Sequence, residues 1–157
     1  MKLELNKTYT FDFTGTVSFG SIEPEKMYEL YRDGRFACEP LSWTLEKEFE
    51  HLVYVDQKGF DFNHPEFPYI EKKQITKSGL KFCPSSMIGT KRSVDYDEVL
   101  SHIKQLNLKF FIVDITQFPV VRATLINGED LVANCSNKSA HYSVTKAQEL
   151  FIDAFES

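Results

Sequence analysis

The chain has 157 residues and a formal net charge of −5, with 42% hydrophobic and 26% charged residues. This length suits one domain that buries a core without disulfides or metal ions as staples. The three cysteines are widely spaced and form no CxxC pair, so we expect neither a disulfide framework nor a zinc site. No apolar run reaches the roughly 18–20 residues of a membrane span, and the N-terminal segment lacks signal-peptide features. We therefore expect a cytoplasmic protein with no membrane partner.

The first third of the chain predicts a strand followed by two helices. Residues 8–18 are rich in Thr, Phe and Tyr and alternate as a strand or hairpin arm does. A helix is expected to begin near Pro24, a residue that suits the first helical turn. A second helix is expected over residues 42–52, with Ser42 as its N-cap and an apolar stripe at i, i+4 and i+7.

The rest of the chain predicts a hairpin, further strands and two helices. These are a strand over 52–55, a hairpin arm over 60–62, a strand over 69–75, a loop over 76–94, a helix over 93–106, strands over 108–115 and 120–126, a turn at Asn127-Gly128 and a helix over 143–155. We therefore expect one α/β (α+β) domain over residues 1–157, in which helices flank a central mixed β-sheet.

Basic residues are concentrated in one segment of this acidic chain. Residues 72–92 hold six bases and no acid, whereas residues 1–71 hold 14 acids and 7 bases. A local patch matters for phosphate binding even where the mean charge is negative. The segment therefore indicates either a phosphate-binding surface or a solvated basic loop.

Two acids and a lysine lie just before and within this segment. Alternation along the expected strand 69–75 places Glu71 and Lys73 on one face, and Asp61 lies ten residues before Glu71. Two carboxylates suit Mg²⁺, a hard cation that takes few protein oxygens together with water and phosphate. Such an ion lowers the pKa of its water, and a neighbouring lysine can orient or deprotonate that water. The pattern therefore indicates metal-dependent phosphodiester cleavage, with Mn²⁺ as a substitute for Mg²⁺.

Asp61 followed by Glu71-x-Lys73 resembles the core motif of the PD-(D/E)xK nuclease superfamily, which includes many type II restriction endonucleases. The expected element order over about residues 42–126 also resembles the αβββαβ core of that superfamily. The motif departs at Phe60, which stands where a proline often precedes the aspartate. The resemblance implies a restriction-endonuclease-like domain in which Asp61 and Glu71 hold the metal and Lys73 assists the attacking water.

The superfamily often adds a glutamate from the helix before the sheet. The expected helix over 42–52 offers Glu46, Glu48 and Glu50. At ~100° per residue, Glu48 lies nearest the apolar stripe, with Glu46 second. We therefore expect Glu48 to point towards the sheet and to join the catalytic residues.

The basic segment directly follows the strand that carries Glu71 and Lys73. Its lysines and arginine suit phosphates, its serines are neutral donors, and its glycines allow close backbone approach. The residues expected to contact DNA are Lys77, Ser78, Lys81, Ser85, Ser86, Lys91 and Arg92.

Our leading hypothesis is a Mg²⁺-dependent endonuclease of the type II restriction class that cleaves double-stranded DNA. Cleavage of both strands at a palindromic site calls for a homodimer. One alternative keeps the site in a structure-selective repair or junction nuclease, and another is a nucleic-acid-binding module without catalysis. If the motif has no function, Glu71 and Lys73 are a cross-strand pair on a surface strand that contributes well under ~1 kcal/mol to stability.

Overall fold

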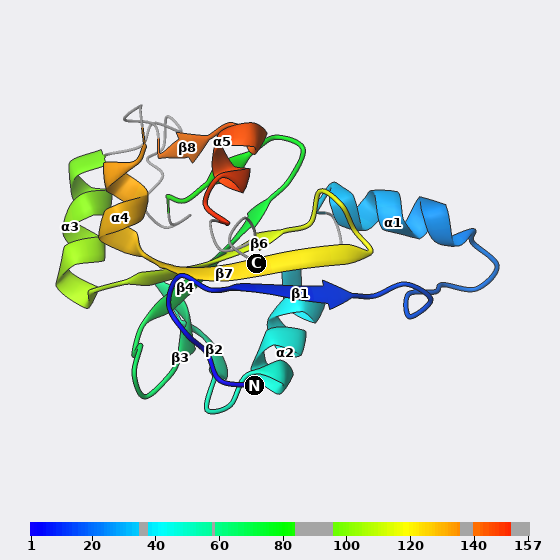
Figure 1. Ribbon diagram of the computed structural model, residues 1–157, viewed down its shortest axis with the longest axis horizontal. Coiled ribbons are helices and arrows are strands. Elements are labelled where there is room, and N and C mark those ends of the chain that lie inside the picture. The colour runs from blue at the N-terminus through cyan, green and yellow to red at the C-terminus, as the bar shows by residue number, and fades with distance from the viewer. Residues whose placement is uncertain (35–37, 58, 84–95, 136–139, 152–157) are drawn as a thin grey trace.

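Six strands form one mixed sheet, and helices cover both of its faces (Figure 1). The structure is a computed structural model that describes residues 1–34, 38–57, 59–83, 96–135 and 140–151. In chain order, the elements are β1 (Thr8–Asp12), α1 (Pro24–Arg32), α2 (Cys38–Glu48), β2 (Val53–Gln57), β3 (Phe60–Asn63), β4 (Ile70–Ile75), β5 (Leu80–Lys81), α3 (Tyr96–Leu106), β6 (Lys109–Asp114), β7 (Val120–Asn127), α4 (Gly128–Ala133), β8 (His141–Tyr142) and α5 (Val144–Gln148).

The order of strands in the sheet is β1-β7-β6-β4-β3-β2. β4 and β6 are parallel, whereas the other neighbours in this sheet are antiparallel. Parallel neighbours need a crossover, and α3 lies in the connection between β4 and β6. The expected mixed sheet and the order α2-β2-β3-β4-α3-β6 are thereby confirmed, with β5 as an addition that pairs with β8.

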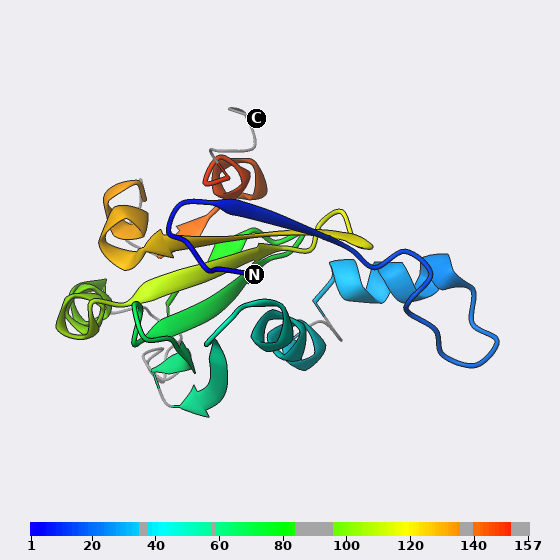
Figure 2. The ribbon, with the colours of Figure 1, turned by 60° about the horizontal axis from the view of Figure 1, so that its bottom comes forward.

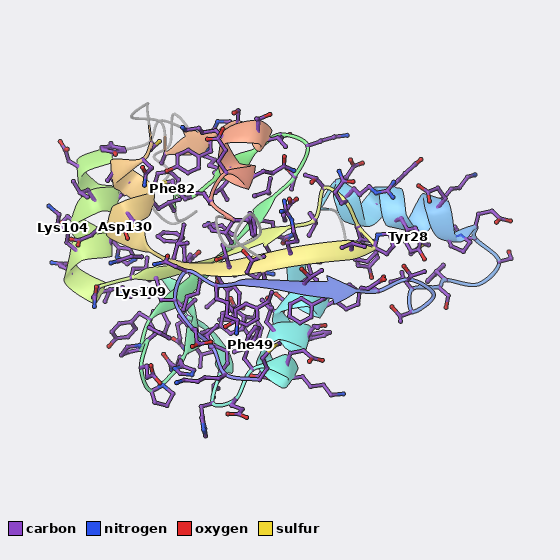
Figure 3. The ribbon with its side chains drawn as sticks, viewed as in Figure 1. Tyr28, Phe49, Phe82, Lys104, Lys109 and Asp130 are labelled. Atoms are coloured by element: carbon purple, nitrogen blue, oxygen red, sulfur yellow. The ribbon has the colours of Figure 1, made fainter. Side chains whose placement is uncertain are left out.

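Two hydrophobic cores lie on opposite faces of the sheet, and β6 contributes to both. Phe111 and Val113 belong to the core between α2 and the sheet, which we call the α2 core. Phe110 and Ile112 belong to the core between the sheet and α3, α4 and α5. Every residue of β6 is buried, as the continuous apolar run predicts for a central strand. Figure 3 shows Phe49, from the α2 core, below the sheet and Phe82, from the other core, above it.

Helix α1 lies beyond one end of the sheet, as Figure 2 shows. Its aromatic side chains hold it there, because Tyr31 stacks on Phe118 with ring centroids 4.5 Å apart. Arg32 adds a hydrogen bond of 2.8 Å from its Nε to the carbonyl oxygen of Phe118. The helix expected from Pro24 is therefore confirmed, and its contacts tie it to the turn between β6 and β7.

The structure corrects several expected boundaries. α2 begins at Cys38, so Ser42 lies buried within the helix and is not its N-cap. Pro40 fits in the first turn because the N–H groups there have no partner within the helix. His51 has a positive φ of 63°, so the chain has left the helix before residue 52.

Two further expectations fail in the C-terminal third. Asn127-Gly128 does not form a hairpin turn, because Gly128 begins α4 and the acidic residues after it favour a helix N-terminus. α5 ends at Gln148, and the chain then turns so that Phe151 is buried beside the guanidinium group of Arg122. Within the described ranges, no helix has the length and apolar character needed to span a membrane.

Candidate active site

Asp61 lies at the point where β3 separates from β4. The two strands share one described pair, Phe62 with Ile70, and beyond it the carboxylate of Asp61 bonds directly to β4. Its Oδ2 accepts a hydrogen bond of 2.8 Å from the backbone N–H of Lys72. The Asp61 carboxylate thus accepts a hydrogen bond that a neighbouring strand would otherwise accept from β4. This contact fixes the carboxylate next to β4.

Glu71 lies beside Asp61 on the same face of the sheet. Glu71 shares a face of β4 with Lys73, and it lies near enough to Asp61 for the two charges to repel each other. Glu71 is only 9% exposed. Burial, followed by repulsion from Asp61, raises the pKa of Glu71 to about 7. Burial also raises the pKa of Asp61. These carboxylates therefore form a poorly solvated pair that a cation would stabilise.

Lys73 completes the cluster from the same strand face. Its Nζ lies 3.4 Å from Oε1 of Glu71 and donates a hydrogen bond of 3.3 Å to the carbonyl oxygen of Cys83. Cys83 is buried two residues after β5, which pairs with β8. The small β5-β8 sheet thus helps to position the lysine. The structure brings together Asp61, Glu71 and Lys73, as the sequence predicts.

The helix glutamates do not join this cluster. Glu48 is exposed, and Glu50 lies 3.9 Å from the N-terminal amino group, so the expected inward orientation of Glu48 is wrong. Glu46 points to the sheet instead, where its Oε2 accepts a hydrogen bond of 2.6 Å from the backbone N–H of Tyr54. The reason is that Ser42 is buried and therefore lies on the inward face of α2. Glu46 follows Ser42 by one helical turn, so it lies on the same face.

Two further charged residues lie near the cluster, and the sequence had given neither of them a place in the site. Asp56 lies at an irregularity of β2 with a φ of 46°, and its charge contributes to the raised pKa of both Asp61 and Glu71. Lys72 is 7% exposed and points to the opposite face from Glu71. In the sequence, Asp56 stands in a polar turn closed by Gly59, which is a poor setting for a rigid metal site, although the same hairpin carries Asp61.

Two lysines of the basic segment (residues 72–92) have acidic partners in the folded chain. Lys73 faces Glu71, and Nζ of Lys77 lies 3.0 Å from Oδ1 of Asp33, which is more than forty residues earlier in the chain. Ser78 and Lys81 are exposed, and the carbonyl oxygen of Ser78 lies 2.9 Å from a ring nitrogen of His141. The remaining candidates for DNA contact lie outside the described residues: Ser85, Ser86, Lys91 and Arg92.

The acid pair can supply two carboxylate ligands to a cation. In the part of the chain that the structure describes, no three His, Cys, Asp or Glu side chains are grouped closely enough to hold a metal ion. Mg²⁺ nevertheless fits a pair, because it commonly binds one or two carboxylates and completes its octahedron with water and phosphate oxygens. Comparisons with protein-family models, with curated proteins and with solved structures each gave no match to this chain.

Proposed function

We propose that this chain is a Mg²⁺-dependent endonuclease that hydrolyses phosphodiester bonds of double-stranded DNA, with a restriction-endonuclease-like core of the PD-(D/E)xK type. One observation carries the proposal: Asp61 is hydrogen-bonded to β4 beside Glu71, and Nζ of Lys73 lies 3.4 Å from Oε1 of Glu71. Both carboxylates have a raised pKa, so their ionised forms lack a sufficient counter-charge from the described residues.

The residues present fit a divalent cation. Burial and mutual repulsion favour protonation of Glu71, and a bound cation would reverse that preference by compensating both negative charges. When bound, Mg²⁺ would acidify water and offset the charge that develops on the phosphate. Asp61 and Glu71 would hold the ion on the side of the sheet that both carboxylates face.

Lys73 would act on the water and on the phosphate. Its ammonium group is held between a carboxylate and a main-chain carbonyl, so its position is defined before the substrate arrives. A positive charge fixed there would orient the attacking water and stabilise charge on the phosphate oxygens. Lys77 and Lys81, both exposed, would contact phosphates further along the DNA. Cleavage of both strands would require two copies of the chain.

The test is cleavage of supercoiled plasmid DNA in the presence of Mg²⁺. The wild type is compared with Glu71→Ala and Lys73→Ala, and with Glu129→Ala and Lys47→Ala as matched variants at exposed helix positions. We expect nicked or linear DNA with the wild type and the matched variants, and a loss of at least ~100-fold in both site variants. Equal cleavage by all five folded proteins would reject the site, and Mg²⁺-independent binding without cleavage would favour a non-catalytic module.

A further inference from the structure

A groove of about 550 Å³ lies at the open end of the β2-β3 hairpin, where β2 begins and β3 ends. Its lining includes Phe60 and Asn63 of β3, Tyr69 directly before β4, and Pro65 and Pro68 from the loop between them. These residues come from the same two strands that carry Asp61 and Glu71. The groove is therefore a neighbour of the proposed site in the chain and in the sheet.

The register of β3 and β4 shows how close the groove lies to the acids. Phe62 pairs with Ile70, and on one side of this pair Asp61 bonds to the backbone N–H of Lys72, next to Glu71. Tyr69 lies directly before β4 and two residues before Glu71, so alternation along this stretch puts the two side chains on one face. Residues two apart on a strand are separated by roughly 6.6 Å. Tyr69 thus lies one same-face position along from Glu71, and Asn63 lines the groove together with it.

The lining suits a flat, neutral group with hydrogen-bonding edges. The side chain of Tyr69 is 36% exposed, and its ring is held in an edge-to-face contact with Phe60 at 4.9 Å. Its backbone is fixed because its carbonyl oxygen accepts a hydrogen bond of 3.1 Å from the N–H of Lys109. Asn63 is exposed and offers an amide donor and acceptor. The described lining contains no Lys, Arg, Asp or Glu; its remaining polar side chains are the histidines His51 and His64.

The loop that closes the groove is also held in place. His64 is buried, and its Nδ1 accepts a hydrogen bond of 3.1 Å from the backbone N–H of Glu66. Its ring stacks on Phe67 with centroids 5.4 Å apart. A wall held by these contacts is preorganised, so a ligand that enters the groove need not order it.

We propose that this groove binds the base of the nucleotide next to the scissile phosphate, stacked on Tyr69 and hydrogen-bonded by Asn63. This inference rests on the proposed nuclease function, because it uses the acid pair to place the phosphate. A base inside a duplex is stacked between its neighbours and cannot lie against a protein ring. The substrate therefore presents a single-stranded or extruded nucleotide beside the cleavage point, which favours a structure-selective enzyme over one that reads only intact duplex.

The test measures the affinity of the protein for a fluorescein-labelled single-stranded oligonucleotide by fluorescence anisotropy, with Ca²⁺ in place of Mg²⁺. The variants are Tyr69→Ala, the conservative Tyr69→Phe, and Phe19→Ala as a control at an aromatic residue that is 69% exposed elsewhere. We expect Tyr69→Ala to weaken binding at least about fivefold, which is the low end for loss of one base–aromatic stack. Tyr69→Phe and Phe19→Ala should bind as the wild type does.

A second oligonucleotide series with one abasic position identifies the base as the occupant. For one placement of the abasic site along the strand, we expect wild type and Tyr69→Ala to bind equally. The base that would stack on Tyr69 is then missing. Equal affinity of wild type and Tyr69→Ala for the intact strand would overturn the inference, as would abasic strands that all bind as tightly as the intact one. Failure of the wild type to bind any oligonucleotide would overturn it too.

Failure of the subsite and failure of the nuclease function can be told apart. Binding that depends on Tyr69, without Mg²⁺-dependent cleavage of any DNA, would support the subsite and reject the nuclease. Cleavage that depends on Lys73 but is equally fast with Tyr69→Ala, on single-stranded and duplex DNA, would support the nuclease and reject the subsite.

Discussion

The carboxylate of Asp61 bonds to the backbone N–H of Lys72 at 2.8 Å, and so joins β3 to the strand that carries Glu71 and Lys73. This contact gives Asp61 two separable roles. Its oxygen satisfies a backbone donor of β4, and its charge contributes to the acid pair. Substitutions that keep the first role and remove the second can therefore test them independently.

Asp61→Asn should fold normally and lose Mg²⁺-dependent cleavage. The amide oxygen can still accept the hydrogen bond from Lys72, but the side chain no longer offers a charged metal ligand. Asp61→Ala should lose cleavage and also about 1–3 kcal/mol of unfolding free energy, because a partly buried donor is left without its partner. Urea denaturation and plasmid cleavage measure the two effects. Equal stability of the Ala and Asn variants would contradict the structural role.

Glu71→Gln should stabilise the protein relative to wild type as the pH rises. The pKa of Glu71 is raised from 4.5 to about 7, so the folded state holds this proton more tightly than the unfolded state. The resulting stability is fully present below pH 4.5 and is lost as the pH rises through about 7. Glutamine does not ionise. The difference in unfolding free energy should therefore shift in favour of Gln by roughly 3 kcal/mol between acid pH and pH 8.

The measurement is urea denaturation of both proteins across that pH range without divalent ions. A difference that does not change with pH would show that Glu71 is not a buried, raised-pKa carboxyl group.

Mg²⁺ should raise the melting temperature more at pH 8 than at pH 5. The ion binds ionised carboxylates, and the raised pKa of Asp61 and of Glu71 keeps protons in competition with it at acid pH. Differential scanning calorimetry with and without Mg²⁺ checks this, with Asp61→Asn as the variant that should lose the shift. An equal shift in wild type and Asp61→Asn would place the ion elsewhere.

Gly79→Ala should destabilise the protein by at least about 2 kcal/mol. Gly79 has a φ of +95°, and an added Cβ would lie 2.2 Å from the carbonyl oxygen of Tyr142 in β8. Gly15→Ala is the matched control, since Gly15 also has a positive φ but no atom lies within 4 Å of its Cβ position. It should lose only about 1 kcal/mol from backbone strain. Thermal or urea denaturation checks the order, and an equal loss in both variants would contradict the close packing of β5 on β8.

The sequence predicted the elements with strong periodicity and the residues that lie close in the chain. β6 is centred on the apolar run from Phe110 to Val113, and Glu71 and Lys73 share a face because they are two residues apart on a strand. Asp61 was identified because it lies on the adjoining hairpin arm. The central strands and the core of the candidate site therefore followed from local pattern alone.

The features that the sequence did not predict depend on distant contacts. Glu48 lies nearest the apolar stripe, yet the helix turns Glu46 inward because Ser42 is also buried. Lys77 has no acidic neighbour in its segment, yet it pairs with Asp33 after folding. Periodicity carries no information on such partners, since they are set by how α1 and α2 pack on the sheet.

The most direct test of the central claim is a crystal structure with Mn²⁺, whose anomalous scattering locates the ion. The proposed site predicts an anomalous peak between the carboxylates of Asp61 and Glu71, within about 2.0–2.4 Å of an oxygen of each. The same peak should be missing in crystals of Asp61→Asn. A wild-type structure with no peak at this pair, at a Mn²⁺ concentration that supports cleavage, would contradict the account.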